Sequence, residues 1–571
     1  MNHDDKRGQD HDMTPEHRIA GILVPVFSLR SPGDQGIGDT FGLIDFIDWA
    51  AAHGFALVKT LPVNETGDDN SPYNAISSVA LDPCLLRLTP AALPDLPEEA
   101  FRRIAGDAAL PAGRVDYATV KRLKMQLLRA AFTRFLERCA ADRALAATFA
   151  AFTAENADWL EDYALHQVVA GLHGGSWASW EPALATPQAA RQTLFGGSPE
   201  QSAKLAGEIV FHKYVQWEAA RQWQRVHDHA RERGVFLMGD IPFGVNYHSV
   251  DVWAERELFL TDWAGGTPPD GFFAHDEFIR KWGQNWGIPL YDWKRMGADG
   301  LKWWRRRVRV ARRYFDFMRI DHVLGFYRLY GFPWRPERND EFLPLSLDEI
   351  ATRTGGRVPH FFPASDEVPA DAARNRATGE ALLRALLEEA GPHRLVGEDL
   401  GFLPPYVRES LESLGMAGYR IPQWERAPSG ALVEGAHYPR LALAMYGTHD
   451  HDPLKSLWRT MAESSTQGDV NDLAAICHFA GIPAPEDAGF SPALHTALLA
   501  ALLRSNAWMA IVQIADVFGW EERVNLPGTS TDANWTWRLP RPFAELAEEG
   551  TAPHIRELIA ASGRAMPPAA G

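Results

Sequence analysis

Acidic residues stand beside Arg or His at the ends of three apolar runs, and these positions are the most suited to chemistry. In the first run, FMRIDHVLGF (317–326), Arg319 lies two residues before Asp321. Side chains two apart on a strand share a face, so the guanidinium can hold the carboxylate ionised and oriented. Asp321 is therefore a candidate nucleophile, and a structural ion pair at a strand end is the alternative interpretation.

The second run, LVGEDLGFLPPYV (395–407), places Glu398 and Asp399 side by side. Repulsion between neighbouring carboxylates raises the pKa of one of them, which suits a general acid near neutral pH. Alternation along the strand sends the two side chains to opposite faces, so we expect only one of them to reach a site. A solvated pair of loop carboxylates is the alternative.

The third run, AMYGTHDHDP (444–453), crowds His449 and Asp450 with other polar residues at a strand end. Metal sites usually draw ligands from helical spacing or from several elements, so we expect no metal here, and instead hydrogen bonds to sugar hydroxyls. The three runs together supply two carboxylates that can act as nucleophile and acid/base, which retaining glycoside chemistry requires. The 20 Trp and 13 Tyr residues agree with a sugar ligand, because aromatic faces stack on sugar rings.

Eight apolar segments, each followed along the chain by a helical pattern, indicate the strands that position these residues. Several of the segments end in an acidic residue. This fits the C-terminal mouth of a parallel barrel, where the loops after the strands build the active site. The sequence therefore predicts an α/β fold, a (β/α)8 TIM barrel, with strands within residues 21–28, 56–61, 235–242, 314–321, 395–399, 418–422, 443–450 and 509–516.

Two intervals are too long to be simple connections between a strand and a helix. Residues 86–205 carry apolar residues at helical spacing, which predicts an inserted, mainly helical subdomain. Residues 334–380 are rich in Pro, Asp and Arg and predict a partly irregular, lid-like insertion. We therefore divide the rest of the chain into a polar tail at 1–18, a barrel at 19–85 and 206–560, and a C-terminal tail at 561–571.

Composition argues against several classes of partner. The 571 residues include 57 Lys and Arg against 74 Asp and Glu, a net charge of −17, so nucleic acid is not an expected partner. The polar N-terminus lacks the apolar core of a secretory signal and no run of about 20 apolar residues occurs, so we expect a cytoplasmic protein without membrane contact. Cys84, Cys139 and Cys477 are far apart, so we expect buried free thiols in a reducing compartment, with neither disulfides nor zinc.

Beyond these patterns, the chain resembles the 4-α-glucanotransferases of the amylomaltase, or disproportionating enzyme, type, in the α-amylase superfamily. The resemblance runs from about residue 20 to 540. Chance similarity is excluded by the number and order of the matching motifs. These are GIGDTFG (36–42), SPYNAISS (71–78), GDIPFGV with DVW (239–253), GTPPDGF with GQNWGIPLYDW (266–293), RIDH, GEDLG, GTHD, and ERVNLPGT with NWTWRL (522–539).

The resemblance implies a function and a role for each matching residue. It implies transfer of α-1,4-glucan segments between maltooligosaccharides, starch or glycogen, with Asp321 as nucleophile, Glu398 as acid/base and no cofactor. Asp450 would be the third carboxylate, which grips the donor sugar, while Arg319 and His449 would hold the nucleophile and that sugar. The family lines its glucan groove at positions that match Ser71, Tyr73, Asp270, Gln284, Trp286 and Asn525. Packing, turn formation or helix capping are the alternative roles for these six residues.

The chain departs from the usual family pattern at His248, Leu324, His451 and Pro453. These residues would flank the sugar subsites, so they bear on the preferred donor or acceptor rather than on the reaction class. Two other functions stay open from the residues alone. One is an α-glucan hydrolase, which uses the same covalent intermediate, and the other is a glucan-binding protein on a degenerate barrel. No feature of the sequence indicates an oligomeric state.

Overall fold

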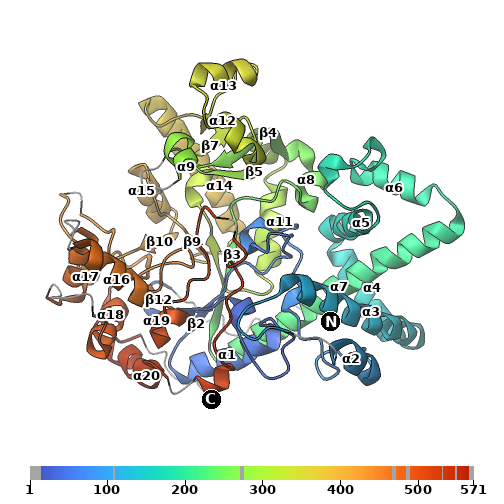
Figure 1. The fold of residues 1–571 in the computed structure, drawn as a ribbon, viewed down its shortest axis with the longest axis horizontal. Helices are drawn as coiled ribbons and strands as arrows, with labels where there is room; N and C mark the ends of the chain where they lie inside the picture. Colours follow the sequence, from blue (N-terminus) through green and yellow to red (C-terminus); the bar gives the residue numbers. More distant parts are fainter. Residues whose placement is uncertain are drawn as a thin grey trace.

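The computed structural model describes residues 14–106, 110–269, 276–427, 429–465, 471–483, 489–529, 531–546 and 549–564. Its centre is a closed barrel of parallel strands in the order β1-β12-β11-β10-β9-β6-β3-β2 (Figure 1). The predicted (β/α)8 barrel is confirmed, because every predicted strand segment overlaps one barrel strand. The bounds are β1 (Ile19–Leu23), β2 (Leu57–Lys59), β3 (Phe236–Ile241), β6 (Phe317–Ile320), β9 (Leu395–Gly397), β10 (Ala417–Arg420), β11 (Ala442–Ala444) and β12 (Met509–Gln513).

The barrel strands are short and almost entirely buried, as strands covered on both sides must be. Because they run parallel, their carboxyl ends meet at one face of the barrel. Asp321 directly follows β6 and Glu398 directly follows β9, while Asp450 lies in the loop after β11. The topology therefore brings the three predicted carboxylates to the same mouth.

Helices surround the barrel, and the first of them begins at a well-defined cap. Asp39 accepts the N–H groups of Phe41 and Gly42 at the start of α1 (Thr40–Ala52). A Cβ on Gly38 would lie 1.9 Å from the carbonyl oxygen of Val26, so only glycine fits there. Among the described residues, no helix is long and apolar enough to cross a membrane. The later helices on the barrel are α11 (Lys302–Ala311), α14 (Pro369–Ala390), α15 (Tyr406–Ser413), α16 (Leu454–Ser465), α17 (Asn471–Ala480), α18 (Pro492–Arg504), α19 (Ile514–Phe518) and α20 (Ala552–Ala561).

The described part of residues 86–205 lies to one side of the barrel and is built around the long helix α7 (Pro199–Glu232), which returns the chain to β3 (Figure 1). Aromatic side chains join α3 to α7, with the ring of Phe135 4.6 Å from Tyr214 and 5.1 Å from Trp217. The helices in this part are α2 (Glu98–Ala105), α3 (Tyr117–Ala141), α4 (Arg143–Glu155), α5 (Ala157–His173) and α6 (Pro187–Phe195).

A second, antiparallel sheet of order β5-β4-β7-β8 lies beside the barrel, at the top of Figure 1. Its strands are β4 (Phe259–Gly266), β5 (Asn285–Tyr291), β7 (Leu329–Phe332) and β8 (His360–Phe362). Trp282, Phe332 and Trp334 belong to its own small apolar core. Residues 334–380 supply β8, α12 (Asn339–Phe342), α13 (Leu347–Arg353) and the start of α14. The short helix α8 (Val250–Ala254) precedes this sheet, α9 (Glu277–Trp282) lies between β4 and β5, and α10 (Trp293–Ala298) follows β5.

Candidate active site

One arginine gathers the carboxylates at the barrel mouth. Arg319 lies on β6 with 1% of its surface exposed, so its guanidinium is fixed inside the protein. Nη1 lies 2.7 Å from Asp240 Oδ1 and 3.0 Å from Asp321 Oδ1, and Nη2 lies 2.8 Å from Glu398 Oε1. These carboxyls come from the ends of three neighbouring strands, β3, β6 and β9. A single cation therefore holds the candidate nucleophile and the candidate acid/base together.

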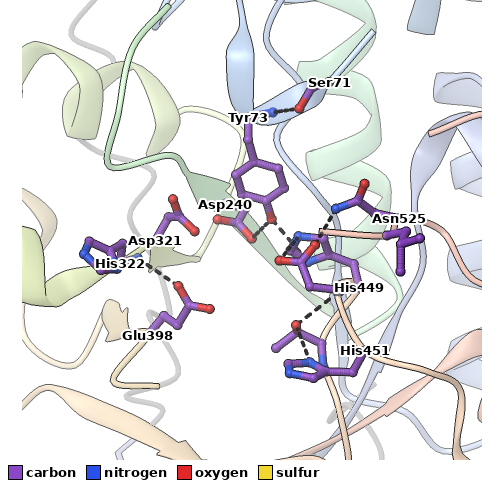
Figure 2. A network of polar contacts seen from close by, with 12 residues as sticks. Ser71, Tyr73, Asp240, Asp321, His322, Glu398, His449, His451 and Asn525 are labelled. Carbon is purple, nitrogen blue, oxygen red and sulfur yellow. Dashed lines mark hydrogen bonds and ion pairs between the residues drawn. The ribbon is translucent and has the colours of Figure 1, made fainter. Parts of the chain in front are cut away.

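Backbone donors complete the binding of both carboxyls. The N–H of Phe243 donates to Asp321 Oδ2 at 3.3 Å, and the N–H of His322 donates to Glu398 at 2.9 Å. His322 adopts a left-handed backbone conformation, φ 39°, at the turn that follows β6. This turn aims the N–H at Glu398, and Figure 2 shows the two carboxyls side by side next to it.

The environment gives the two carboxyls opposite proton affinities. Burial, together with the negative charges of Glu398 and Asp240, raises the pKa of Asp321 to about 8, although Arg319 opposes the shift. Burial also acts on Glu398, but Arg319 and the N–H of His322 outweigh it and lower its pKa. In the absence of substrate, the environment of the pair therefore favours the proton on Asp321 over Glu398.

The prediction of a raised pKa for Glu398 is wrong for the free site, because the repulsion expected from Asp399 does not act there. Asp399 is buried on the opposite side of β9, where it accepts the N–H of Tyr419 and lies 3.2 Å from Arg408 and 3.3 Å from Arg420. Burial raises the pKa of Asp399 to about 6 against the pull of these two arginines. Of the two adjacent carboxylates, only Glu398 faces the site.

Asp450 lies opposite the pair and is held by an amide and an imidazole. Asn525 Nδ2 donates to Asp450 Oδ1 at 2.7 Å, and His449 Nε2 lies 3.3 Å from Oδ2. Burial alone would raise the pKa of Asp450. His449 and Asn525 more than offset this effect, so the pKa of Asp450 lies well below its usual range. Asp450 therefore stays ionised, and its carboxylate oxygens can accept further hydrogen bonds.

Tyr73 connects the two sides of the site. Its ring stacks on His449 with centroids 4.7 Å apart and an interplanar angle of 10°, and its hydroxyl donates to Asp240 at 2.9 Å (Figure 2). Ser71 contacts Tyr73 rather than the carboxyls: its Oγ accepts the N–H of Tyr73 at 3.3 Å and caps the short turn Pro72–Asn74. Ser71 thus shapes the turn that presents Tyr73.

The second sheet reaches the site through Trp286 on β5. The Trp286 ring meets His322 edge to face at 4.8 Å, and its Nε1 donates to Gln284 Oε1 at 3.2 Å. Trp286 is 37% exposed, which is unusual for a tryptophan. Gln284 and Trp286 are therefore brought together, and Trp286 contacts His322, whose N–H donates to Glu398. Asp270 lies outside the described residues.

The four residues that depart from the family pattern all lie outside the barrel strands. His451 Nδ1 accepts the N–H of Thr448 at 2.9 Å. His248 contacts Ser176 of the inserted helical part at 2.5 Å. Leu324 lies in the short turn Val323–Phe326 after Asp321, and Pro453 immediately precedes α16.

Sequence reasoning missed three residues of the site, Lys59, Asp240 and His322. The sequence did offer a signal for two of them: Lys59 is a charged residue inside the apolar run ALVKTL, and Asp240 is one inside the run VFLMGDIP. Their contact at 3.0 Å depends on the pairing of β2 with β3, which the sequence pattern does not specify. Within the part of the chain that the structure describes, no group of three or more His, Cys, Asp or Glu side chains is arranged to hold a metal ion.

Comparison with known proteins agrees with this geometry. A family model described as 4-alpha-glucanotransferase matches residues 24–544. The 4-alpha-glucanotransferase of Thermus thermophilus is 31% identical over 91% of this chain and 95% of its own, and that of Synechocystis sp. is 30% identical over 92% and 94%. The fold is similar to the amylomaltase of Streptococcus agalactiae solved in complex with acarbose, with a TM-score of 0.75 at 21% identity, covering 96% of this chain and all of that one. The chain therefore belongs to the 4-alpha-glucanotransferase family.

Proposed function

We propose that this protein is a 4-α-glucanotransferase that moves segments of α-1,4-glucan between chains by a retaining double displacement. The observation that carries the proposal is the guanidinium of Arg319, which lies 3.0 Å from Asp321 and 2.8 Å from Glu398 at the barrel mouth. Two adjacent carboxyls of this kind are the requirement of the retaining mechanism. Membership of the family supports the choice of reaction.

In the first half of the reaction, the ionised Asp321 attacks the anomeric carbon of the donor sugar. Glu398 gives its proton to the glycosidic oxygen, so the C–O bond breaks and the leaving glucan departs as an alcohol. The free site favours the proton on Asp321, so the proton must pass to Glu398 as the donor binds. The leaving oxygen near Glu398 and the positive charge that develops near Asp321 both favour this transfer.

In the second half, a hydroxyl of the acceptor sugar takes the place of the departed glucan. Glu398 removes the proton of that hydroxyl, whose oxygen attacks the anomeric carbon, and the ester bond to Asp321 breaks. Asp450 and His449 are assigned to the hydroxyls of the donor sugar, which they would hold through both halves. The stacking of Tyr73 on His449 supports this assignment, because it fixes the imidazole against rotation.

Transfer competes with hydrolysis, because water can also capture the intermediate. Water is far more concentrated than any acceptor, so transfer wins only where the acceptor is bound and aligned. We assign the acceptor side to Gln284 and Trp286, together with residues 265–269 and 334–380, whereas the stacking of Tyr73 on His449 favours the donor side for Tyr73. Trp286 is partly exposed and its ring contacts His322, whose N–H donates to Glu398. This position beside the acid/base supports the assignment.

We further propose that residues 86–205 are an inserted helical subdomain, that 334–380 is a lid-like insertion, and that the enzyme works in the cytoplasm without a cofactor. The free thiols of Cys84, Cys139 and Cys477 support a reducing compartment. Cys84 and Cys477 are buried, whereas Cys139 is half-buried.

The proposal is tested by a product ladder from purified protein incubated separately with each maltooligosaccharide from maltose to maltoheptaose. A transferase given maltotriose produces longer oligomers together with glucose or maltose, and total reducing ends stay constant. A hydrolase produces only shorter sugars, and reducing ends increase. Absence of any product from all donors would favour a glucan-binding protein instead.

A further inference from the structure

Side chains of alternating charge lie on or directly after four neighbouring barrel strands, beside the Asp321–Glu398 pair. Lys59 ends β2, Asp240 lies on β3, Arg319 lies on β6, and Glu398 follows β9, and these strands are neighbours in this order. Lys59 Nζ lies 3.0 Å from Asp240 Oδ2, Asp240 Oδ1 lies 2.7 Å from Arg319, and Arg319 lies 2.8 Å from Glu398. In the pairing of β3 with β6, Asp240 stands directly opposite Arg319.

The proposed mechanism assigns no role to Lys59. It is 2% exposed, in a barrel interior where branched apolar side chains are usual. Its ammonium donates to Asp240 and, at 3.3 Å, to the carbonyl of Thr60. Burial lowers the pKa of Lys59, while the charge of Asp240 opposes this shift. Burying a lysine beside a carboxylate seldom improves stability over an apolar pair, so we look for its effect in the site.

The charges of this cluster explain what Lys59 can do. Two cations, Lys59 and Arg319, face the three carboxyls of Asp240, Asp321 and Glu398. Unbalanced buried charge is costly, so one of the three carboxyls keeps a proton near neutral pH. Without Lys59, one cation would face the same three carboxyls, and all of them would bind protons more tightly.

We propose that Lys59 is a positioning residue that acts through Asp240 and Arg319 to set how many protons the Asp321–Glu398 pair holds. The inference rests on the proposed function in taking these two carboxyls as the reacting pair. Because Lys59 neutralises Asp240, the guanidinium of Arg319 remains shared with Asp321 and Glu398. Asp321 is then able to ionise when the donor sugar binds.

Other titratable groups also face the cluster and must be considered. Burial raises the pKa of Tyr73 and of Tyr419. It lowers the pKa of His322 to about 4 and also lowers the pKa of His451. His449 lies 3.3 Å from Asp450. All of these groups stay the same in the variants below, so differences between variants report Lys59 and Asp240. The groups are Tyr73, His322, Tyr419, His449, Asp450 and His451.

The test is the pH dependence of kcat/KM for α-maltotriosyl fluoride with maltose as acceptor. Fluoride leaves without a proton from Glu398, so the acidic limb of the profile reports the ionisation of Asp321. In Lys59→Met, this limb should move to higher pH by about one unit, the size expected for loss of a nearby opposite charge. In Asp240→Asn it should move to lower pH. In the Lys59→Met/Asp240→Asn double variant the limb should return to the wild-type position. One cation then faces two carboxyls, so the carboxyls again outnumber the cations by one, as in the wild type.

Lys124 provides a matched control, since it is also fully buried and donates to Gln35 at 2.7 Å, outside the site. Lys124→Met should leave the acidic limb in place, and circular dichroism should show that each variant is folded. If Lys59→Met does not fold, the limb of the double variant should still lie at higher pH than that of Asp240→Asn.

The proposal is overturned if folded Lys59→Met keeps the wild-type limb, if Lys124→Met shifts it equally, or if Asp240→Asn and the double variant share one limb. The profile is read on cleavage of the donor, whether water or maltose captures the intermediate. A wild-type enzyme that only hydrolyses would therefore contradict the proposed transferase function while leaving this test intact.

Discussion

At the Asp321 carboxyl, burial and neighbouring anions favour the protonated form, whereas attack on the anomeric carbon requires the ionised form. Arg319 reconciles the two, because it contacts both Asp321 and Glu398 and so stabilises a negative charge on either. The proton can therefore move from one carboxyl to the other without leaving an unpaired buried charge. This makes the free site a resting state, which donor binding converts into the reactive one.

Replacing the nucleophile should separate catalysis from folding. Asp321→Asn should lower the rate of transfer by a factor on the order of 10⁴ or more, because an amide cannot form the covalent ester. The thermal midpoint should stay the same or rise, since burial disfavours the ionised form of this carboxyl in the free protein. Activity is measured by the maltotriose ladder and stability by calorimetry. Near-native activity in a preparation free of wild-type enzyme would remove Asp321 from this role.

Replacing the acid/base should affect donors unequally. Glu398→Gln should slow a natural maltooligosaccharide by roughly 10²- to 10⁴-fold, because its leaving oxygen needs a proton, and slow an activated aryl glycoside much less. The comparison uses steady-state kinetics of both donors with the same acceptor. An equal loss with both donors would show that Glu398 is not the acid. Asp399 is then no ready substitute, because it faces Arg408 and Arg420 instead of the site.

The residue types of the site were predictable only where the chemistry is local in sequence. The spacing of Arg319 and Asp321 predicts that both lie on one side of their strand. The adjacent pair Glu398 and Asp399 predicts that one of these two carboxylates reaches the site. Lys59 and Asp240 were not predicted, because each becomes informative only when β2 and β3 lie side by side. The pKa of Glu398 was wrongly predicted for the same reason, since its value depends on Arg319 and His322 rather than on its neighbour in sequence.

At the scale of elements, the barrel strands were predictable because buried parallel strands read as short apolar runs. The second sheet was not predicted, because β4 and β8 are partly exposed and therefore do not read as buried apolar runs. Its strands pair across long stretches of chain, β4 with both β5 and β7. This sheet matters for function, since it carries Trp286 to the edge of the site.

Trp286 provides a prediction at this scale. Trp286→Ala should raise the ratio of hydrolysis to transfer several-fold while lowering total bond cleavage less, because an unaligned acceptor loses its advantage over water. Both products are quantified from maltotriose by chromatography. Trp263→Ala is the matched control, since Trp263 lies on the same sheet but packs against His360 and Phe362. An unchanged ratio in folded Trp286→Ala would exclude it from the acceptor site.

For the molecule as a whole, buried carboxyls make stability depend on pH. Asp516 on α19 is 3% exposed and accepts the N–H of Leu454 at 2.6 Å, which fixes the start of α16. Burial raises the pKa of Asp516 to about 7, above its usual 3.8. The folded protein therefore keeps a proton that the unfolded chain has lost. This stabilising contribution is complete below about pH 4 and is lost as the pH rises through about 7.

Asp516→Asn tests this dependence, because an amide keeps the oxygen that accepts the N–H of Leu454 but does not ionise. The midpoint of the variant minus that of the wild type should increase by roughly 2 °C between pH 5 and pH 8, measured by calorimetry. Glu232→Gln, at an exposed position at the end of α7, is the control and should show no such trend. A constant difference for Asp516→Asn would show that this carboxyl does not contribute to the pH dependence.

The most direct test of the central claim is to trap the covalent intermediate. Glu398→Gln is given α-maltotriosyl fluoride without acceptor, so that the ester forms but its breakdown is slow, and the protein is then digested and its peptides are sequenced by mass spectrometry. We predict a maltotriosyl group on Asp321, absent from the Asp321→Asn/Glu398→Gln double variant. A maltotriosyl group on another residue, or turnover of the fluoride with inversion and no adduct, would contradict a double displacement through Asp321.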